Sequence, residues 1–218
     1  GARAFSGLAL NFNGTCGLWR RSAIADAGGW QHDTLTEDMD LSYRVQLVGW
    51  RCTFRLDLAV PGEIPTTVSA WRTQQFRWAK GSAQTGRKLL GRILKSPLPW
   101  KVKLEAFVHL TNNGAYLLTV LVSLLVFPAM ILRRGGSPWA LLAIDLPLFF
   151  ASTVSVLSFY VASQACQAAS NPTWKRELRY LPALLGLGIG LSLNNARAVT
   201  SGFFRRGGTF VRTPKYRI

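Results

Sequence analysis

The chain has 218 residues, a formal net charge of +16, 49% apolar residues and 17% charged residues. This aliphatic and aromatic content excludes an intrinsically disordered chain. Three widely spaced cysteines, Cys16, Cys52 and Cys166, exclude a small disulfide scaffold and lack the spacing of zinc ligands. Because the sequence begins at Gly1 without a signal-peptide pattern, we expect it to be part of a longer protein.

The first half of the chain carries patterns of short helices and turns. A helix is predicted over residues 21–27, where Gly28 and Gly29 can close it. A second helix is predicted over residues 35–47. Residues 51–59 alternate in polarity as a strand does, so we predict a strand there.

A long helix is predicted to begin after Thr66 or Thr67, either of which can cap it, and to run to about Leu94. The prolines of residues 96–99 stop this helix. We therefore predict a domain boundary near residue 98, with a membrane region over residues 99–218.

Two long apolar runs follow this boundary. Residues 114–132 and 146–163 contain no charged side chain, and runs of about 18 such residues are typical of membrane-spanning helices. We predict spans over about 107–132 and 139–163. The alternative, helices of a large soluble core, suits a chain of this size poorly. A third run is shorter and interrupted by glycines, so residues 180–205 are predicted to form an interfacial or re-entrant helix.

The first candidate catalytic motif is Thr36-Glu37-Asp38, at the start of the helix predicted over residues 35–47. Thr36 is a plausible N-cap, and carboxylates in a first helical turn lie near the positive end of the helix dipole. A positioned, ionised carboxylate can act as a general base. The alternative is a capping cluster without a catalytic role. Asp38 and Asp40 also form a D-x-D pattern, but side chains two positions apart on a helix diverge.

The second candidate motif is Gln74-x-x-Arg77-Trp78, whose three named residues share one helical face. A guanidinium group matches phosphate oxygens, and an indole offers a flat face to a sugar ring. This set suits a sugar-phosphate ligand. The alternative is an amphipathic helix on a membrane surface, and both interpretations are compatible with each other.

A third segment, residues 210–215, combines hydroxyl and cationic groups after the last apolar run. The alternative is a basic juxtamembrane tail attracted to anionic lipid. His32 and His109 share no metal-ligand spacing.

The order of these motifs resembles that of the family 2 membrane glycosyltransferases, the cellulose-synthase-like superfamily. The resemblance is closest to mannan- and glucomannan-synthase-like and related bacterial members. It rests on five segments: Phe12-Asn13-Gly14-Thr15, Gly28-Gly29-Trp30, residues 35–41, Glu63-x-Pro65 and residues 74–81.

This resemblance implies an α/β fold, with residues 1–98 as the C-terminal, acceptor half of a GT-A domain followed by membrane helices. Asp38 matches the family's catalytic base. Acceptor and donor binding would fall to Thr36, Glu37, Gln74, Arg77, Trp78, Phe12, Asn13, Gly14 and Thr15. A gating loop would comprise Phe210, Thr213 and Lys215, although Arg212 departs from the usual pattern.

The resemblance also implies partners. We expect a nucleotide-sugar donor of the UDP-glucose or GDP-mannose class, a glycan acceptor and a lipid bilayer, but no nucleic acid. A divalent cation, Mg or Mn, is expected to be held mostly by a preceding half, with no metal ligand in residues 1–218. The chain alone is then expected to be inactive. Its location would be an inner or plasma membrane, or a Golgi membrane in a eukaryote, with the catalytic half cytosolic.

The function implied is inverting transfer of a hexose to a growing β-glycan. Two alternatives remain open: a non-processive transferase with a lipid or short acceptor, and a non-enzymatic basic membrane protein.

Overall fold

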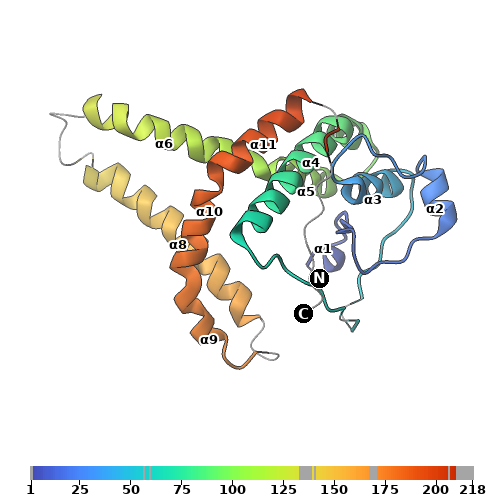
Figure 1. The fold of residues 1–218 in the computed structure, drawn as a ribbon, viewed down its shortest axis with the longest axis horizontal. Helices are drawn as coiled ribbons and strands as arrows, with labels where there is room; N and C mark the ends of the chain where they lie inside the picture. Colours follow the sequence, from blue (N-terminus) through green and yellow to red (C-terminus); the bar gives the residue numbers. More distant parts are fainter. Residues whose placement is uncertain are drawn as a thin grey trace. The chain divides into compact units, whose positions relative to one another are not determined.

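The computed structural model describes residues 2–55, 57–58, 60–132, 139, 141–166, 171–205 and 207–209 (Figure 1). The chain divides into two compact units. The first comprises Gly1–Leu118 and Leu193–Ile218, and the second comprises Thr119–Ser192. The first unit contains the motifs singled out above, except for residues 210–215, which lie outside the described residues.

The α/β fold expected from the resemblance is wrong for this part of the chain. Within the described residues the structure contains helices, turns and irregular segments but no β-strand. Residues 51–55 and 57–58, the described part of the stretch predicted as a strand, are irregular or bent. A strand needs a neighbour to pair its backbone N–H and C=O groups, and the described residues provide none.

Local sequence signals fix the helices of the first unit. The short helix α2 (Arg21–Asp26) ends where Gly28 and Gly29, both at positive φ, donate to the carbonyls of Ala25 and Ile24. Helix α3 runs over Glu37–Leu47. Helix α4 (Val68–Lys95) begins where the Thr67 hydroxyl accepts from the N–H of Ala70.

Among the described residues, this unit also contains α1 (Ala2–Phe5), α5 (Trp100–Thr111) and α11 (Ser192–Phe204). A short 3-10 turn, η1 (Asn112–Gly114), follows α5. Helices α4 and α5 pack against each other, and α3 packs on α4.

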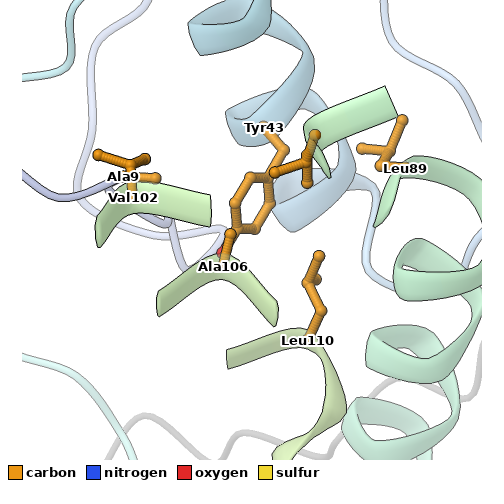
Figure 2. Close-up of a cluster of buried hydrophobic side chains, with 7 residues drawn as sticks. Ala9, Tyr43, Leu89, Val102, Ala106 and Leu110 are labelled. Carbon is orange, nitrogen blue, oxygen red and sulfur yellow. The ribbon is translucent and has the colours of Figure 1, made fainter. Parts of the chain in front are cut away.

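Tyr43 occupies the centre of the main hydrophobic cluster, which Figure 2 shows. Its ring, from α3, lies among Ala106 and Leu110 of α5 and Leu89 of α4. Tyr43 therefore joins α3 to both α4 and α5. A separate cluster packs Ala79 and Ala83 of α4 against Ala198 and Val199 of α11.

The second unit contains apolar helices. Helix α6 (Ala115–Leu132) enters it from the first unit. It is followed by the π-helical turn η2 (Leu141–Asp145), α8 (Leu146–Ala165), α9 (Trp174–Glu177), η3 (Leu178–Tyr180) and α10 (Leu181–Gly190).

Among the described residues, two helical stretches are long and apolar enough to cross a membrane. They are Trp100–Leu132, with a mean hydropathy of 2.4 in its most apolar window, and Leu146–Ala165, with 1.6. The side chains of these windows are not buried against protein.

The segment predicted as one helix over residues 180–205 forms two helices instead. The break falls at Leu191, between α10 and α11. Small residues on α11 allow it to approach α4 closely: a Cβ at Gly202 would lie only 2.6 Å from the carbonyl oxygen of Lys80. Helix α11 therefore differs from α10, whose apolar side chains are not buried, because α11 packs on α4.

Candidate functional site

Asp38 lies in the first turn of α3, where helix geometry and neighbouring chain hold its carboxylate in a defined position. Its Oδ1 accepts from the backbone N–H of Met39 at 2.8 Å. Ser42, one turn later, donates its hydroxyl to the Asp38 carbonyl at 2.7 Å. The carboxylate is half-buried, so a ligand can still reach it.

The loop of Phe12 to Thr15 lies directly beside this carboxylate. Phe12 donates its N–H to the Ser42 hydroxyl at 2.9 Å, which attaches the loop to α3. Gly14 has φ +77°, and a Cβ there would lie 2.8 Å from Asp38 Oδ2. Both its conformation and its proximity to Asp38 therefore require glycine at this position. Asn13 Oδ1 accepts from the N–H and hydroxyl of Thr15, which closes the loop.

Helix α4 carries the Gln-Arg-Trp motif on its N-terminal half. Gln74 and Arg77 are half-buried, whereas Trp78 has 48% of its surface exposed. The Arg77 charge acts on both Glu37 and Asp38. The structure thus brings Arg77 to the start of α3, with an exposed indole next to it on the chain.

Burial raises the pKa of Asp38 above its ordinary value, and the charge of Glu37 adds to this shift. The Met39 N–H and the Arg77 charge lower it in part. Burial likewise lowers the pKa of Arg77, and the charges of Glu37 and Asp38 oppose this shift. A carboxylate with a raised pKa holds a proton more strongly, which is a useful property in a base that must accept one.

Thr36 does not cap α3 with its side chain, although it occupies the N-cap position. Its hydroxyl instead lies 3.2 Å from that of Thr85, in the interior between α3 and α4. A Cβ at Gly81 would lie 2.5 Å from Thr36 Cγ2 and 2.8 Å from the Thr36 backbone nitrogen. The predicted capping role is therefore wrong, and Thr36 joins the two motif-bearing helices.

Asp40, the second carboxylate of the D-x-D pattern, serves the fold. It is fully buried and forms ion pairs with Arg44 at 2.7 Å and with Lys88 at 2.9 Å. Lys88 also binds Asp33 and Gln31. Because these cations occupy Asp40, it is not available with Asp38 for a divalent cation.

Among the residues that the structure describes, no three His, Cys, Asp or Glu side chains gather closely enough to hold a metal ion. The residues of this site therefore do not by themselves fit the divalent cation that the resemblance implies.

The residues that sequence reasoning missed follow the Gln-Arg-Trp motif on α4. They are Gln84, Thr85 and Lys88, and each contacts the segment of residues 31–40, as does Gly81 at the end of the segment quoted for the resemblance. Their spacing of three and four places them on one helix face, which is a signal that the sequence contains. Nothing local, however, indicates what that face contacts.

The predicted gating residues Phe210, Thr213 and Lys215 lie outside the described residues. The chain just before them is hydrogen-bonded to the segment that leads into the Thr36-Glu37-Asp38 motif and to α4. Gly207 donates its N–H to the Asp33 carbonyl at 3.2 Å, and Gln84 donates to the carbonyls of Arg205 and Gly207.

Comparison with known proteins agrees with these motifs. The model of "Glycosyl transferase family group 2" matches residues 2–156. Glucomannan 4-beta-mannosyltransferase 7 of Arabidopsis thaliana is 40% identical over 127 residues, which are 56% of this chain and 23% of that protein. Glucomannan 4-beta-mannosyltransferase 1 of Cyamopsis tetragonoloba is 36% identical over 153 residues, which are 68% of this chain and 28% of that protein.

These matches span about a quarter of the length of the curated relatives. No solved structure matches the chain. The family model nevertheless covers well over half of it, including Asp38, the loop of Phe12 to Thr15 and the Gln-Arg-Trp motif. The chain therefore belongs to the family 2 glycosyltransferases, as a member of their cellulose-synthase-like type.

Proposed function

We propose that the chain contributes the acceptor-activating part of a membrane-bound, inverting glycosyltransferase that adds hexose units to a β-glycan. One observation carries this proposal. The half-buried Asp38 carboxylate lies between the Gly14 loop and α4, with a raised pKa and the Arg77 charge acting on it. Transfer from a sugar diphosphate needs a base for the acceptor hydroxyl and a positive charge near the leaving diphosphate, and Asp38 and Arg77 would provide these two groups.

In the proposed reaction, Asp38 accepts the proton of an acceptor hydroxyl. The hydroxyl oxygen then bonds to the anomeric carbon of the donor sugar as the bond to the nucleoside diphosphate breaks. Attack from the face opposite the leaving group inverts the configuration. Positioning the two reactants in line supplies much of the rate enhancement.

Arg77 would stabilise the negative charge that develops on the leaving diphosphate, because its planar fork matches phosphate oxygens. Trp78 would stack on the acceptor sugar with its exposed indole, and Gln74 would bind a hydroxyl. Thr36 and Glu37 would shape the site from the start of α3. We propose no step through a metal ion for these residues.

The names of the relatives favour a mannosyl donor. Both relatives described above are named for 4-beta-mannosyl transfer in glucomannan. We therefore propose a donor of the GDP-mannose class, with UDP-glucose as the second donor to test.

We further propose that the two apolar stretches cross a bilayer, with residues 1–95 on the cytosolic side where nucleotide sugars are found. The basic side chains of residues 175–179 and 197–205 would then be cytosolic, in agreement with the positive-inside rule. Arg133 and Arg134, which come between the two stretches in the sequence, would lie outside and count against this orientation.

Membranes carrying the complete gene product, incubated with labelled GDP-mannose or UDP-glucose, test the proposal through the size and linkage of the products. Asp38→Asn is expected to lower the transfer rate on the order of 100-fold or more, because a positioned base is lost. Asp57→Asn, at an exposed carboxylate paired with Arg55, is the matched control and should keep full activity. Wild-type turnover by the Asp38→Asn enzyme would overturn the assignment.

A further inference from the structure

A polar pocket lies between α4, the loop before α3 and the end of α11. Its volume is about 320 Å³, and its lining includes Asp33, Thr34, Gln84, Arg87, Lys88 and Arg205. Asp38 and the Gln-Arg-Trp motif do not line it. The proposed transfer reaction therefore leaves this pocket without a role.

The hydroxyl of Thr34 in this pocket has no hydrogen-bond partner in the described part of the chain. Thr34 is only 5% exposed, and its Oγ1 has no hydrogen-bond partner among the residues that the structure describes. Leaving a buried hydroxyl unpaired is costly, typically about 1–3 kcal/mol. Two residues later, the buried hydroxyl of Thr36 does find a partner in Thr85. Because Thr34 lines the pocket, a rotation of its side chain would turn this hydroxyl toward a ligand there, which would provide the missing partner.

Positive charge predominates in the lining. Lys88 is paired with Asp33 at 2.7 Å, so these two charges largely offset each other. Arg87 and Arg205 remain as the excess charge. Arg87 donates one N–H to the carbonyl of Phe203, which leaves most of the five guanidinium N–H donors for a ligand. Guanidinium groups bind phosphate oxygens with favourable fork geometry.

We propose that this pocket binds a phosphate group through the guanidinium groups of Arg87 and Arg205 and the hydroxyl of Thr34. The inference is independent of the proposed glycosyl transfer. The phosphate can come from a free anion in solution or from a lipid headgroup. Arg205 also lines a neighbouring groove with Phe76, Leu117 and Phe204, whose apolar walls would suit acyl chains.

A phosphate bound in this pocket would connect the loop that precedes α3 with the chain that follows α11. Thr34 lies two residues before Thr36, and Arg205 lies two residues before Gly207, which is bonded to Asp33. A bound phosphate would reinforce this contact and hold the end of α11 against the loop that leads into α3.

Titration of the whole chain in a maltoside detergent, which has no phosphate group, tests the proposal. Inorganic phosphate should raise the thermal unfolding midpoint, while chloride at equal ionic strength should not. Dioctanoyl phosphatidic acid is compared with dioctanoylglycerol, which lacks the phosphate. Tighter binding of the phosphatidic acid than of inorganic phosphate assigns the site to a lipid headgroup, and equal binding assigns it to a free anion.

Variants identify the site. Arg87→Gln with Arg205→Gln should weaken phosphate binding by about tenfold or more. Arg92→Gln, an exposed arginine on α4 outside the pocket, should bind as the wild type does. Thr34→Val keeps the side-chain shape. Without phosphate it should be at least as stable as the wild type, but it should bind phosphate several-fold more weakly.

The proposal would be overturned by no binding of either phosphate compound, by an equal loss in Arg92→Gln, or by wild-type binding in either the double arginine variant or Thr34→Val. Arg77→Gln separates this site from the proposed catalytic site, since it should retain phosphate binding. Loss of binding in Arg77→Gln would show that the phosphate lies beside Asp38 instead.

Discussion

The hydroxyls of Thr36 and Thr85 lie 3.2 Å apart in the buried contact between α3 and α4. This pair joins the start of the helix that bears Asp38 to the helix that bears Gln74, Arg77 and Trp78. Gly81, one turn before Thr85, allows the close approach. The position of Asp38, the proposed base, relative to Arg77 therefore depends on how these two helices pack.

Gly81→Ala is expected to destabilise the chain by about 1–3 kcal/mol, the usual cost of overpacking. The new methyl group would meet the backbone nitrogen of Thr36, which cannot rotate away. Thermal or denaturant unfolding of the chain in detergent measures the effect. The matched control is Gly91→Ala on the same helix, where a Cβ would meet nothing within 4 Å. This control should gain up to about 1 kcal/mol from better helix propensity, and a similar gain in Gly81→Ala would contradict the packing argument.

Gly14→Ala is expected to lower activity about ten- to a hundredfold by displacing the Asp38 carboxylate. Gly7→Ala is its control, because Gly7 also has a positive φ but has open space around it. Both variants should lose about 1–2 kcal/mol of stability from the left-handed conformation. Only Gly14→Ala should lose transfer activity in labelled-sugar assays beyond what its stability explains. Equal activities would show that the loop does not position Asp38.

The pH dependence of transfer should report the charges around Asp38. A base must be deprotonated, so activity should fall as the pH drops through the raised pKa of Asp38. The Glu37 charge raises this pKa and the Arg77 charge lowers it. Glu37→Gln should therefore shift the acidic limb of the pH–rate profile to lower pH, and Arg77→Gln should shift it to higher pH. Shifts in the same direction would contradict the assignment of Asp38 as the titrating base.

Lys88→Met is expected to destabilise the chain by roughly 3 kcal/mol, as is usual when one partner of a buried ion pair is removed. Asp40 is fully buried and would keep only Arg44 as a cationic partner. Lys101→Met, at an exposed position of α5, should change the free energy of unfolding by less than about 0.5 kcal/mol. A Lys88→Met chain as stable as this control would show that the ion pairs contribute little.

The sequence by itself determined those features that depend on neighbouring residues. Thr67 begins α4 because a hydroxyl caps the N–H groups within reach of it, and Gly28 and Gly29 end α2 because glycine adopts positive φ without strain. The two uncharged apolar runs were likewise recognisable from composition. The order of the motifs sufficed to identify the family, since that order is a property of the chain alone.

Tertiary structure decided what depends on partners distant in the sequence. The alternation of residues 51–59 predicted a strand, but no strand pairs with this stretch in the described part of the chain. Local sequence suggested a capping role for Thr36, yet its hydroxyl pairs with a residue 49 positions away. The contact of Gly14 with Asp38 and the ion pair of Lys88 with Asp40 both depend on how the loop and the helices pack. The reason is physical: a cap or a turn is satisfied within a few residues, whereas a buried hydroxyl or carboxylate takes whichever partner the packed helices bring within hydrogen-bonding distance.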